Sequence, residues 1–304
     1  MSYRLPPYTV RFPLSAASIR EVDWGVSSYG IPELWKRGEG QGVKVAVIDS
    51  GAAHHYALSA VAERKNFSED ESELDEIGHG THVAGIICGS QPPARGIAPR
   101  SEVHALKVLG GDGKCSAESV CDALYYASAL GCDIACLSLG STAKSEKLHK
   151  AIRDVNSQGL IVVAAAGNDG GSVNFPAAFL ETVAVGAVDR DGEVCPFSSR
   201  GEEIVCAAPG QDIQSTWLAG GYATVSGTSM AAPFVVGVLA LYISTLGRRA
   251  TPEEVLAALQ ETSKDAGQEG KDNEYGWGLI DPHKLVTYRA LHRDGVTLYT
   301  PEKE

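Results

Sequence analysis

The chain has 304 residues and a mass of 32.0 kDa, of which 44% are hydrophobic and 21% charged. This composition is typical of a folded globular protein, and it excludes a disordered chain, a collagen-like fibre and a small disulfide-stapled module. The net charge is −12 without a basic stripe, so we expect neither nucleic acid nor an anionic membrane as a partner.

The first forty residues are predicted to form an arm, since prolines and a polar run at residues 15–20 precede the first strong strand signal. Prolines and an arginine interrupt this region, which therefore lacks the continuous apolar core of a secretory signal. The strand signal covers residues 43–48, is nearly all apolar and ends in Asp49. Such a strand is typical of a sheet covered on both faces.

Strand and helix signals then alternate along the chain. Helical patterns at residues 117–130 and 144–157 each stop at a glycine, a common helix C-cap. A further helix start lies at residues 78–85. Five strand signals lie at residues 103–108, 134–139, 160–165, 182–188 and 203–207. The alternation predicts βαβ units and an α/β fold, a three-layer sandwich with a mostly parallel central sheet and helices on both faces.

Two segments near the C-terminus also predict helices. Residues 231–246 are apolar but contain a proline and a glycine and are short for a membrane span, which favours a buried helix. Residues 251–254 match a capping box with proline at the first helical position. No repeat or linker divides the chain, so we expect an N-terminal extension, one main domain and a C-terminal tail at residues 1–30, 31–285 and 286–304.

Asp49 and His79 are two candidates for acid–base chemistry. Asp49 ends the first strand, and ligands and catalytic groups gather at the carboxyl ends of parallel strands. Taken alone, its carboxylate could orient an imidazole, bind a metal or cap a turn. His79 opens a helix between two glycines, where it could exchange protons near neutral pH or be a polar cap. His82 is interpreted as a buried structural histidine.

Ser229 and Asn168 occupy comparable positions further along the chain. Ser229 begins the apolar helix, where it could be a nucleophile beside the positive end of the helix dipole or only an N-cap. Asn168 follows a strand, and its amide could donate to an oxyanion or form a turn. Ala231 replaces the second glycine of a Gly-x-Ser-x-Gly elbow, which argues against an α/β-hydrolase.

The seven cysteines indicate the redox compartment. Their number is odd and several lie in apolar runs, which favours buried free thiols over disulfides. We therefore expect a cytoplasmic protein. Zinc is a weaker alternative, because no Cys-x-x-Cys pair lies beside a matching histidine pair.

Four segments together resemble the signature blocks of the subtilisin family of serine proteases. These are residues 47–51, 79–85, 165–168 and 227–233, and the order Asp, His, Ser matches that of the family. The resemblance extends from about residue 31 to residue 285. It implies a subtilisin-like fold and a serine endopeptidase that hydrolyses peptide bonds in proteins or peptides through an acyl-enzyme on Ser229.

The resemblance also implies a role for each site residue. Ser229 would attack the scissile carbonyl, His79 would take and return its proton, and Asp49 would hold the imidazole. Asn168 would donate to the oxyanion. The walls of the substrate cleft would be Ser138, Leu139, Gly140, Ala165, Ala166 and Gly167. Hydrogen bonds between a cleft wall and the substrate backbone do not depend on the substrate's side chains, so we expect broad specificity.

A shorter resemblance concerns the N-terminal arm. The segment Leu5, Pro6, Pro7 and Tyr8 is similar to the Leu-Ile-Pro-Tyr segment of the intracellular subtilisins, in which an N-terminal extension lies across the active site and inhibits it. Proline has no N–H and a fixed φ, so it spoils strand pairing and can carry a scissile bond out of register. The alternative is a terminus that merely contains two prolines.

The resemblance leaves metal ions and oligomeric state open. It implies no cofactor for the chemistry, and structural calcium is a possibility because family members hold it with loop oxygens. The loop at residues 86–95 is short and proline-rich where secreted relatives carry a longer, calcium-binding loop, and the carboxylates of residues 69–76 are typical of a solvated loop. A homodimer is also a possibility by analogy with intracellular relatives.

Two other functions compete with a general protease. A protease-like scaffold could bind peptides without cleaving them, although all four catalytic positions are occupied. A specialised protease could process one precursor, but such enzymes often carry insertions around the cleft, and no large insertion is present. General proteolysis is therefore the favoured hypothesis.

Overall fold

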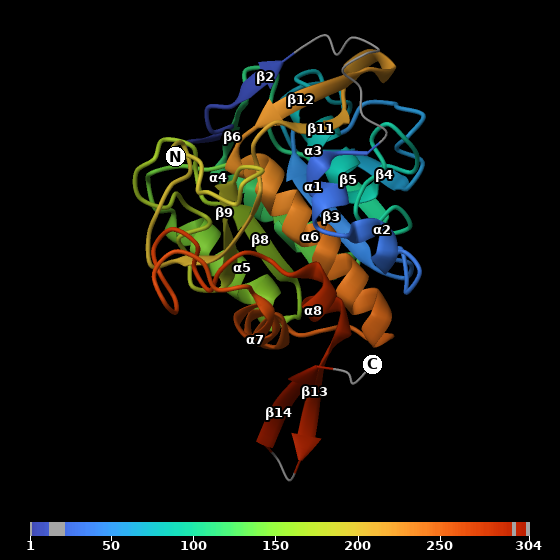
Figure 1. Cartoon of the computed structure of the whole chain (residues 1–304). Helices are drawn as coiled ribbons and strands as arrows, with labels where there is room; N and C mark the ends of the chain where they lie inside the picture. Colours follow the sequence, from blue (N-terminus) through green and yellow to red (C-terminus); the bar gives the residue numbers. More distant parts are fainter. Residues whose placement is uncertain (1, 12–21, 294–295, 302–304) are drawn as a thin grey trace.

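The structure is a computed structural model of the whole chain, and it describes residues 2–11, 22–293 and 296–301 (Figure 1). Its centre is a sheet of seven strands in the order β10-β9-β8-β7-β3-β5-β4, and every neighbouring pair is parallel. The strands are β3 (Lys44–Asp49), β4 (Val61–Asn66), β5 (Glu102–Lys107), β7 (Ile134–Leu137), β8 (Ile161–Ala165), β9 (Thr182–Val188) and β10 (Ile204–Pro209).

Helices cover both faces of this sheet, which confirms the predicted three-layer sandwich. On one face α3 (His79–Cys88) and α6 (Thr228–Leu246) pack on each other and on the sheet; on the other lie α4 (Ala117–Ala129) and α5 (Glu146–Ser157). Alternate residues of β3 enter opposite cores: Val45 and Val47 pack with α3 and α6, whereas Ala46 and Ile48 pack with α4 and α5. The apolar run therefore fits a strand buried on both faces.

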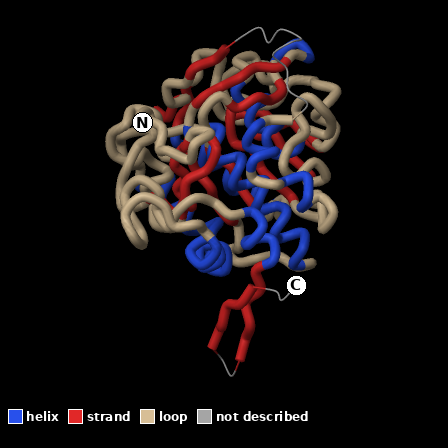
Figure 2. Tube along the Cα trace, in the orientation of Figure 1, coloured by secondary structure: helices blue, strands red, loops and turns tan. Residues whose placement is uncertain are grey.

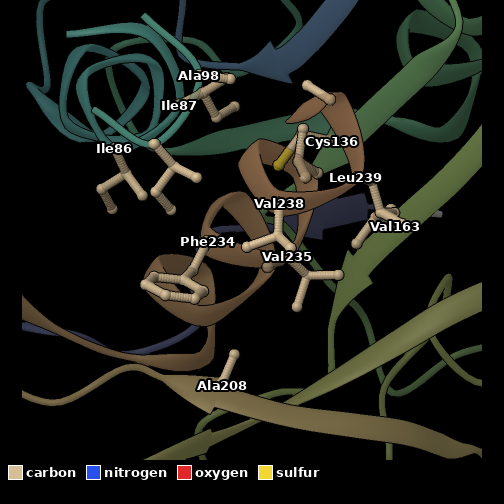
Figure 3. Packing of buried hydrophobic residues seen from close by; sticks show 14 of the residues in the cluster. Ile86, Ile87, Ala98, Cys136, Val163, Ala208, Phe234, Val235, Val238 and Leu239 are labelled. Atoms are coloured by element: carbon tan, nitrogen blue, oxygen red, sulfur yellow. The ribbon is translucent and has the colours of Figure 1, made fainter. Parts of the chain in front are cut away.

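Helix α6 passes through the larger core (Figure 3). Its side chains Val235, Val238 and Leu239 belong to the same cluster as Cys136 of β7 and Val163 of β8. It is long and apolar enough to span a membrane by composition, yet 83% of the tested stretch is buried inside the protein. A helix that is apolar all round belongs in a core, so the prediction of a buried helix is confirmed.

The remaining elements lie around this body. Helices α1 (Trp24–Ser28), α2 (Ile31–Leu34) and α8 (Pro282–Thr287) are short, and α7 (Pro252–Thr262) has the predicted capping box. An antiparallel sheet joins β11 (Ile213–Thr216), β12 (Tyr222–Ser226) and β2 (Thr9–Arg11), and β1 (Ser2–Arg4) pairs with β6 (Lys114–Ser116). Figure 2 shows the C-terminal hairpin, β13 (Tyr288–Arg293) and β14 (Val296–Pro301), standing clear of the body.

Candidate active site

Asp49 and His79 meet at the carboxyl end of the central sheet. Asp49 is the last residue of β3 and His79 the first residue of α3, and the His79 Nδ1 atom lies 2.8 Å from Asp49 Oδ1. Both side chains are fully buried. The geometry fits an Nδ1–H that donates to the carboxylate, which leaves the Nε2 lone pair free to accept a proton.

Ser229 lies on the first turn of α6 and is tied to the segment after β7. Its hydroxyl donates to the Ser138 carbonyl at 3.2 Å, and the Ser138 hydroxyl donates to the Ser229 carbonyl at 3.0 Å. Among the residues that the structure describes, the buried His79 Nε2 atom has no hydrogen-bond partner. The serine hydroxyl is therefore turned toward Ser138 and does not bond to the imidazole.

Asn168 is held in one orientation by hydrogen bonds. Its Oδ1 atom accepts from the Thr228 amide at 2.8 Å and from the Thr228 hydroxyl at 2.7 Å, so its Nδ2 group must be the donor on the other side. That group donates to the Pro7 carbonyl at 2.8 Å. The side-chain amide of Asn168 is thus oriented to donate to a carbonyl oxygen close to Ser229.

The predicted cleft walls lie at the same edge of the sheet. Ser138, Leu139 and Gly140 follow β7. Ala165 is the last residue of β8, the neighbouring strand, and Ala166 and Gly167 come directly after it. Gly140 exchanges two backbone hydrogen bonds with Arg4, at 3.1 and 2.9 Å. The Gly167 amide donates to the Thr228 hydroxyl at 3.2 Å. The two wall segments therefore border Ser229 and Asn168, and Gly140 offers its backbone for strand pairing.

The N-terminal arm covers this site. Strand β1 pairs with β6, and Arg4 pairs with Gly140 of the wall segment after β7, so the arm enters between these two segments. Beyond the site, β2 pairs with β12. The Tyr8 ring lies 5.0 Å from the His79 ring, and the Leu5 amide donates to the Gly113 carbonyl at 3.1 Å. The sequence did not predict these arm strands, because each has three residues and depends on its partner.

Tyr3 anchors the arm, a role that no pattern in the sequence indicates. Its side chain is fully buried in the core cluster that contains Cys115, Cys121 and Leu124. Burial raises the pKa of the Tyr3 phenol to about 12, with smaller effects from the two cysteines. An aromatic residue of the arm therefore fills an apolar pocket between β6 and α4.

His82 is the buried structural histidine that the sequence predicts. Its side chain is fully buried, and the Nε2–H group donates to the carbonyls of Ile213 at 3.1 Å and Ala223 at 3.2 Å. Burial, with a smaller effect from His79, lowers the pKa of His82 to about 3. The ring stays neutral near neutral pH and joins α3 to β11 and β12.

The acidic loop is more ordered than a solvated charge run. The buried ammonium group of Lys107 lies 3.0 Å from Asp70 Oδ2 and 3.4 Å from Glu76 Oε2 and donates to the Leu74 carbonyl. Asp75 is also buried. Within the described ranges, no group of three or more His, Cys, Asp or Glu side chains is arranged to hold a metal ion. These carboxylates are occupied by protein donors.

The fold and the site define a class of protein: a serine hydrolase with an aspartate–histidine pair and an amide donor on a parallel α/β sheet. Comparison with known families then identifies the protein family. The chain belongs to the subtilase family, whose model matches residues 40–278. It is accordingly a serine endopeptidase of the subtilisin type, which acts on proteins or peptides.

Known proteases resemble the chain over most of its length. It is 38% identical over 276 residues to the minor extracellular protease Epr of Bacillus subtilis (strain 168), a match that covers 88% of this chain and 42% of Epr. It is 38% identical over 267 residues to subtilisin Savinase of Lederbergia lenta, covering 86% of this chain and 97% of that protein. The chain is also 38% identical over 266 residues to M-protease of Shouchella clausii (strain KSM-K16), a match that covers 86% of this chain and 69% of M-protease.

Proposed function

We propose that the chain is a general endopeptidase in which Ser229 is the nucleophile, His79 the general base and Asp49 the residue that orients the imidazole. The buried 2.8 Å contact between His79 and Asp49 carries this proposal. When the Ser229 hydroxyl turns from the Ser138 carbonyl to His79 Nε2, it can pass its proton to the imidazole as it attacks the substrate carbonyl. Asn168 Nδ2 then donates to the developing oxyanion.

A serine-directed fluorophosphonate tests the nucleophile. The reagent should label the protein at Ser229, and Ser229→Ala should abolish labelling and lower kcat on the order of 10⁶-fold, the size known when this group is removed from a subtilisin. Ser244→Ala is a matched control, because Ser244 is a helical serine of α6 whose hydroxyl bonds to the Gln41 carbonyl. Labelling at another serine, or full activity of Ser229→Ala, would contradict the assignment.

We infer that the cleft accepts many substrates. Gly140 pairs with Arg4 through both backbone groups, and a substrate strand can use the same groups whatever its side chains. Small residues in the second wall, Ala165, Ala166 and Gly167, leave room for a large side chain. A peptide-library cleavage profile separates this proposal from the alternative: broad cleavage supports it, and one strict recognition sequence would favour a precursor-processing protease.

We propose further that the arm inhibits the enzyme. Its Pro7 carbonyl rests on the Asn168 amide, and its Tyr8 ring lies against His79. Continuing the antiparallel register from Arg4 and Gly140 brings Pro6 opposite Ser138. Proline has no N–H to donate to the Ser138 carbonyl. The Ser229 hydroxyl bonds to that carbonyl instead, which supports an arm that is bound as a pseudosubstrate and keeps the nucleophile away from the base.

Deletion of residues 1–20 tests the inhibition. The shortened protein should hydrolyse peptides faster than the full chain, and a peptide of residues 1–11 added in excess should slow it again. In the full chain, Tyr3→Ala should also raise the rate because it removes the buried anchor, whereas Ser2→Ala, at an exposed neighbour, should not. An unchanged rate after the deletion would remove the inhibitory role.

We also propose a cytoplasmic location. All seven cysteines are free and buried, which supports a protein made for a reducing compartment, although the relative Epr is named as an extracellular protease. Structural calcium and a homodimer remain proposals that come from the family resemblance alone.

A further inference from the structure

Asp75 is a buried carboxylate that the proposed mechanism does not use. It lies in the acidic loop before α3 and is only 4% exposed. Its Oδ1 atom accepts from the amides of Ile77 and Gly78, both at 2.9 Å. Its Oδ2 atom accepts from the Thr81 amide at 2.9 Å and from the Thr81 hydroxyl at 2.6 Å. Both oxygens of the Asp75 carboxylate therefore accept hydrogen bonds from the start of α3.

That helix start has no cap of its own. The N-cap residue of α3 is Gly78, which has no side chain and a φ of +95°, so the free amides of the first turn need an acceptor from elsewhere. Asp75 supplies it, and its negative charge complements the positive end of the helix dipole. His79 is the first residue of this helix, so the position of the imidazole depends on how firmly the turn is held.

Asp75 is also linked to Asp49. The Ser50 hydroxyl lies 2.9 Å from Asp75 Oδ1 and 3.2 Å from Asp49 Oδ1, and it accepts a hydrogen bond from the Gly80 amide at 2.9 Å. The Ser50 amide donates to Asp49 Oδ1 at 2.7 Å. One buried network therefore joins the end of β3, which carries Asp49, to the first turn of α3, which carries His79.

The negative charge of Asp75 also acts on the groups around His79. The pKa of the Tyr8 phenol is raised by burial first and then by the charges of Asp49 and Asp75. Titratable neighbours of His79 within the described part of the chain include Asp49 on β3, Tyr8 on the arm and His82 on α3. The ammonium group of Lys107 on β5 donates to the Leu74 carbonyl and pairs with Asp70 and Glu76.

We propose that Asp75 is a positioning residue for catalysis: it fixes the Asp49–His79 pair by capping the helix that carries the histidine and by bonding Ser50 beside the aspartate. This inference rests on the proposed roles of Asp49, His79 and Ser229. An electrostatic effect follows, because a second buried negative charge stabilises the imidazolium that forms when Ser229 gives up its proton.

The substitution Asp75→Asn in the full chain tests this role. The amide oxygen can still accept from two donors, but its NH₂ group must face the donors of Thr81, so the first turn of α3 loosens. We expect kcat to fall about 10- to 100-fold with KM nearly unchanged. The downfield proton NMR signal of the His79 Nδ1–H, which reports the hydrogen bond to Asp49, should shift and broaden because the turn that carries the histidine is held less firmly.

A matched control is Asp133→Asn. Asp133 is another buried aspartate; it accepts from the Lys44 amide at 2.9 Å and pairs with Arg249, at the opposite end of β3. It should lower the melting temperature without moving kcat or the His79 signal. If Asp75→Asn lowers only the melting temperature in the same way, the positioning role is wrong.

A second variant keeps the test decisive if Asp75→Asn does not fold. Ser50→Ala leaves the four bonds from Asp75 to the start of α3 intact. It removes the hydroxyl that joins Asp75, Asp49 and the Gly80 amide, so it should still lower kcat. An unchanged kcat would overturn the proposal. The proposed function fails by a different result, namely activity that survives Ser229→Ala.

Discussion

At the scale of single residues, Asn168 gives a sharp prediction. Asn168→Ala removes the only side-chain donor on the Pro7 carbonyl among the described residues, and kcat should fall about 10²- to 10³-fold, the size known for an oxyanion-hole donor in a subtilisin. KM should change little, because the negative charge develops only in the transition state. Steady-state kinetics on a peptide substrate measure both.

The control for that measurement is Asn156→Ala. Asn156 is a half-buried asparagine of α5 whose amide donates to the Glu181 carbonyl at 3.2 Å, away from the site. It should leave kcat unchanged. If Asn168→Ala raised KM as strongly as it lowered kcat, Asn168 would act in substrate binding rather than on the oxyanion.

The residues of the site were predictable to different degrees. Asp49, His79, Asn168 and Ser229 each had an ordinary structural alternative when taken alone, and only the resemblance of their four segments to the signature blocks of one family led to the expectation that they assemble. Asp75 could not be found in this way, because one carboxylate in an acidic run looks solvated until the loop is seen to fold over the amides of α3. Nor does the sequence indicate that the Ser229 hydroxyl binds the Ser138 carbonyl.

At the scale of elements, the contact between α3 and β11 depends on Gly85. A Cβ atom there would overlap the hydroxyls of Ser215 and Thr216. Those hydroxyls donate to the carbonyls of His82 and Thr81 at 2.8 Å, so they cannot move without breaking two hydrogen bonds. We expect Gly85→Ala to lower the free energy of unfolding by about 1–3 kcal/mol, measured by urea denaturation.

Gly111→Ala is the matched control for Gly85→Ala. A Cβ atom at Gly111 would meet no other atom within 4 Å, and its φ is not positive. This variant should have nearly the stability of the parent. Equal losses in the two variants would mean that the close packing of α3 on β11 is not the cause.

Elements with an apolar pattern were predicted well, and those that depend on a partner were not. The strands that form the middle of the sheet are apolar on both faces, and the glycines after α4 and α5 have the positive φ of a helix C-cap. Strand β4 was missed because it lies at the edge of the sheet and only Val61 and Ala62 are apolar, whereas the residues from Glu63 to Asn66 are polar. Strands β1 and β2 exist only through pairing with β6 and β12.

At the scale of the whole molecule, Asp23 makes stability depend on pH. It caps α1, and its oxygens accept from the amides of Gly25 at 2.7 Å and Gln214 at 2.9 Å. Burial raises its pKa from 3.8 to about 6, partly offset by these hydrogen bonds. Between pH 4 and 6 the folded protein therefore holds more protons than the unfolded chain, and the contribution of Asp23 to stability falls as the pH rises.

The comparison of Asp23→Asn with the parent measures this effect. The free energy of unfolding of the variant, relative to the parent, should rise by up to about 3 kcal/mol between pH 4 and pH 7, since a shift of one pKa unit corresponds to about 1.4 kcal/mol. Asp112→Asn, at an exposed aspartate, should show a flat difference over that range. A flat difference for Asp23→Asn as well would show that its carboxyl group titrates normally.

The position of helix α6 couples unfolding of the protein to loss of its activity. Its first turn carries Ser229, and its remaining length fills the larger core. Heat or solvent that loosens the interior must therefore displace the proposed nucleophile in the same event, so we expect no partly unfolded intermediate with a disordered core to keep cleaving other proteins. Loss of structure therefore also ends proteolysis.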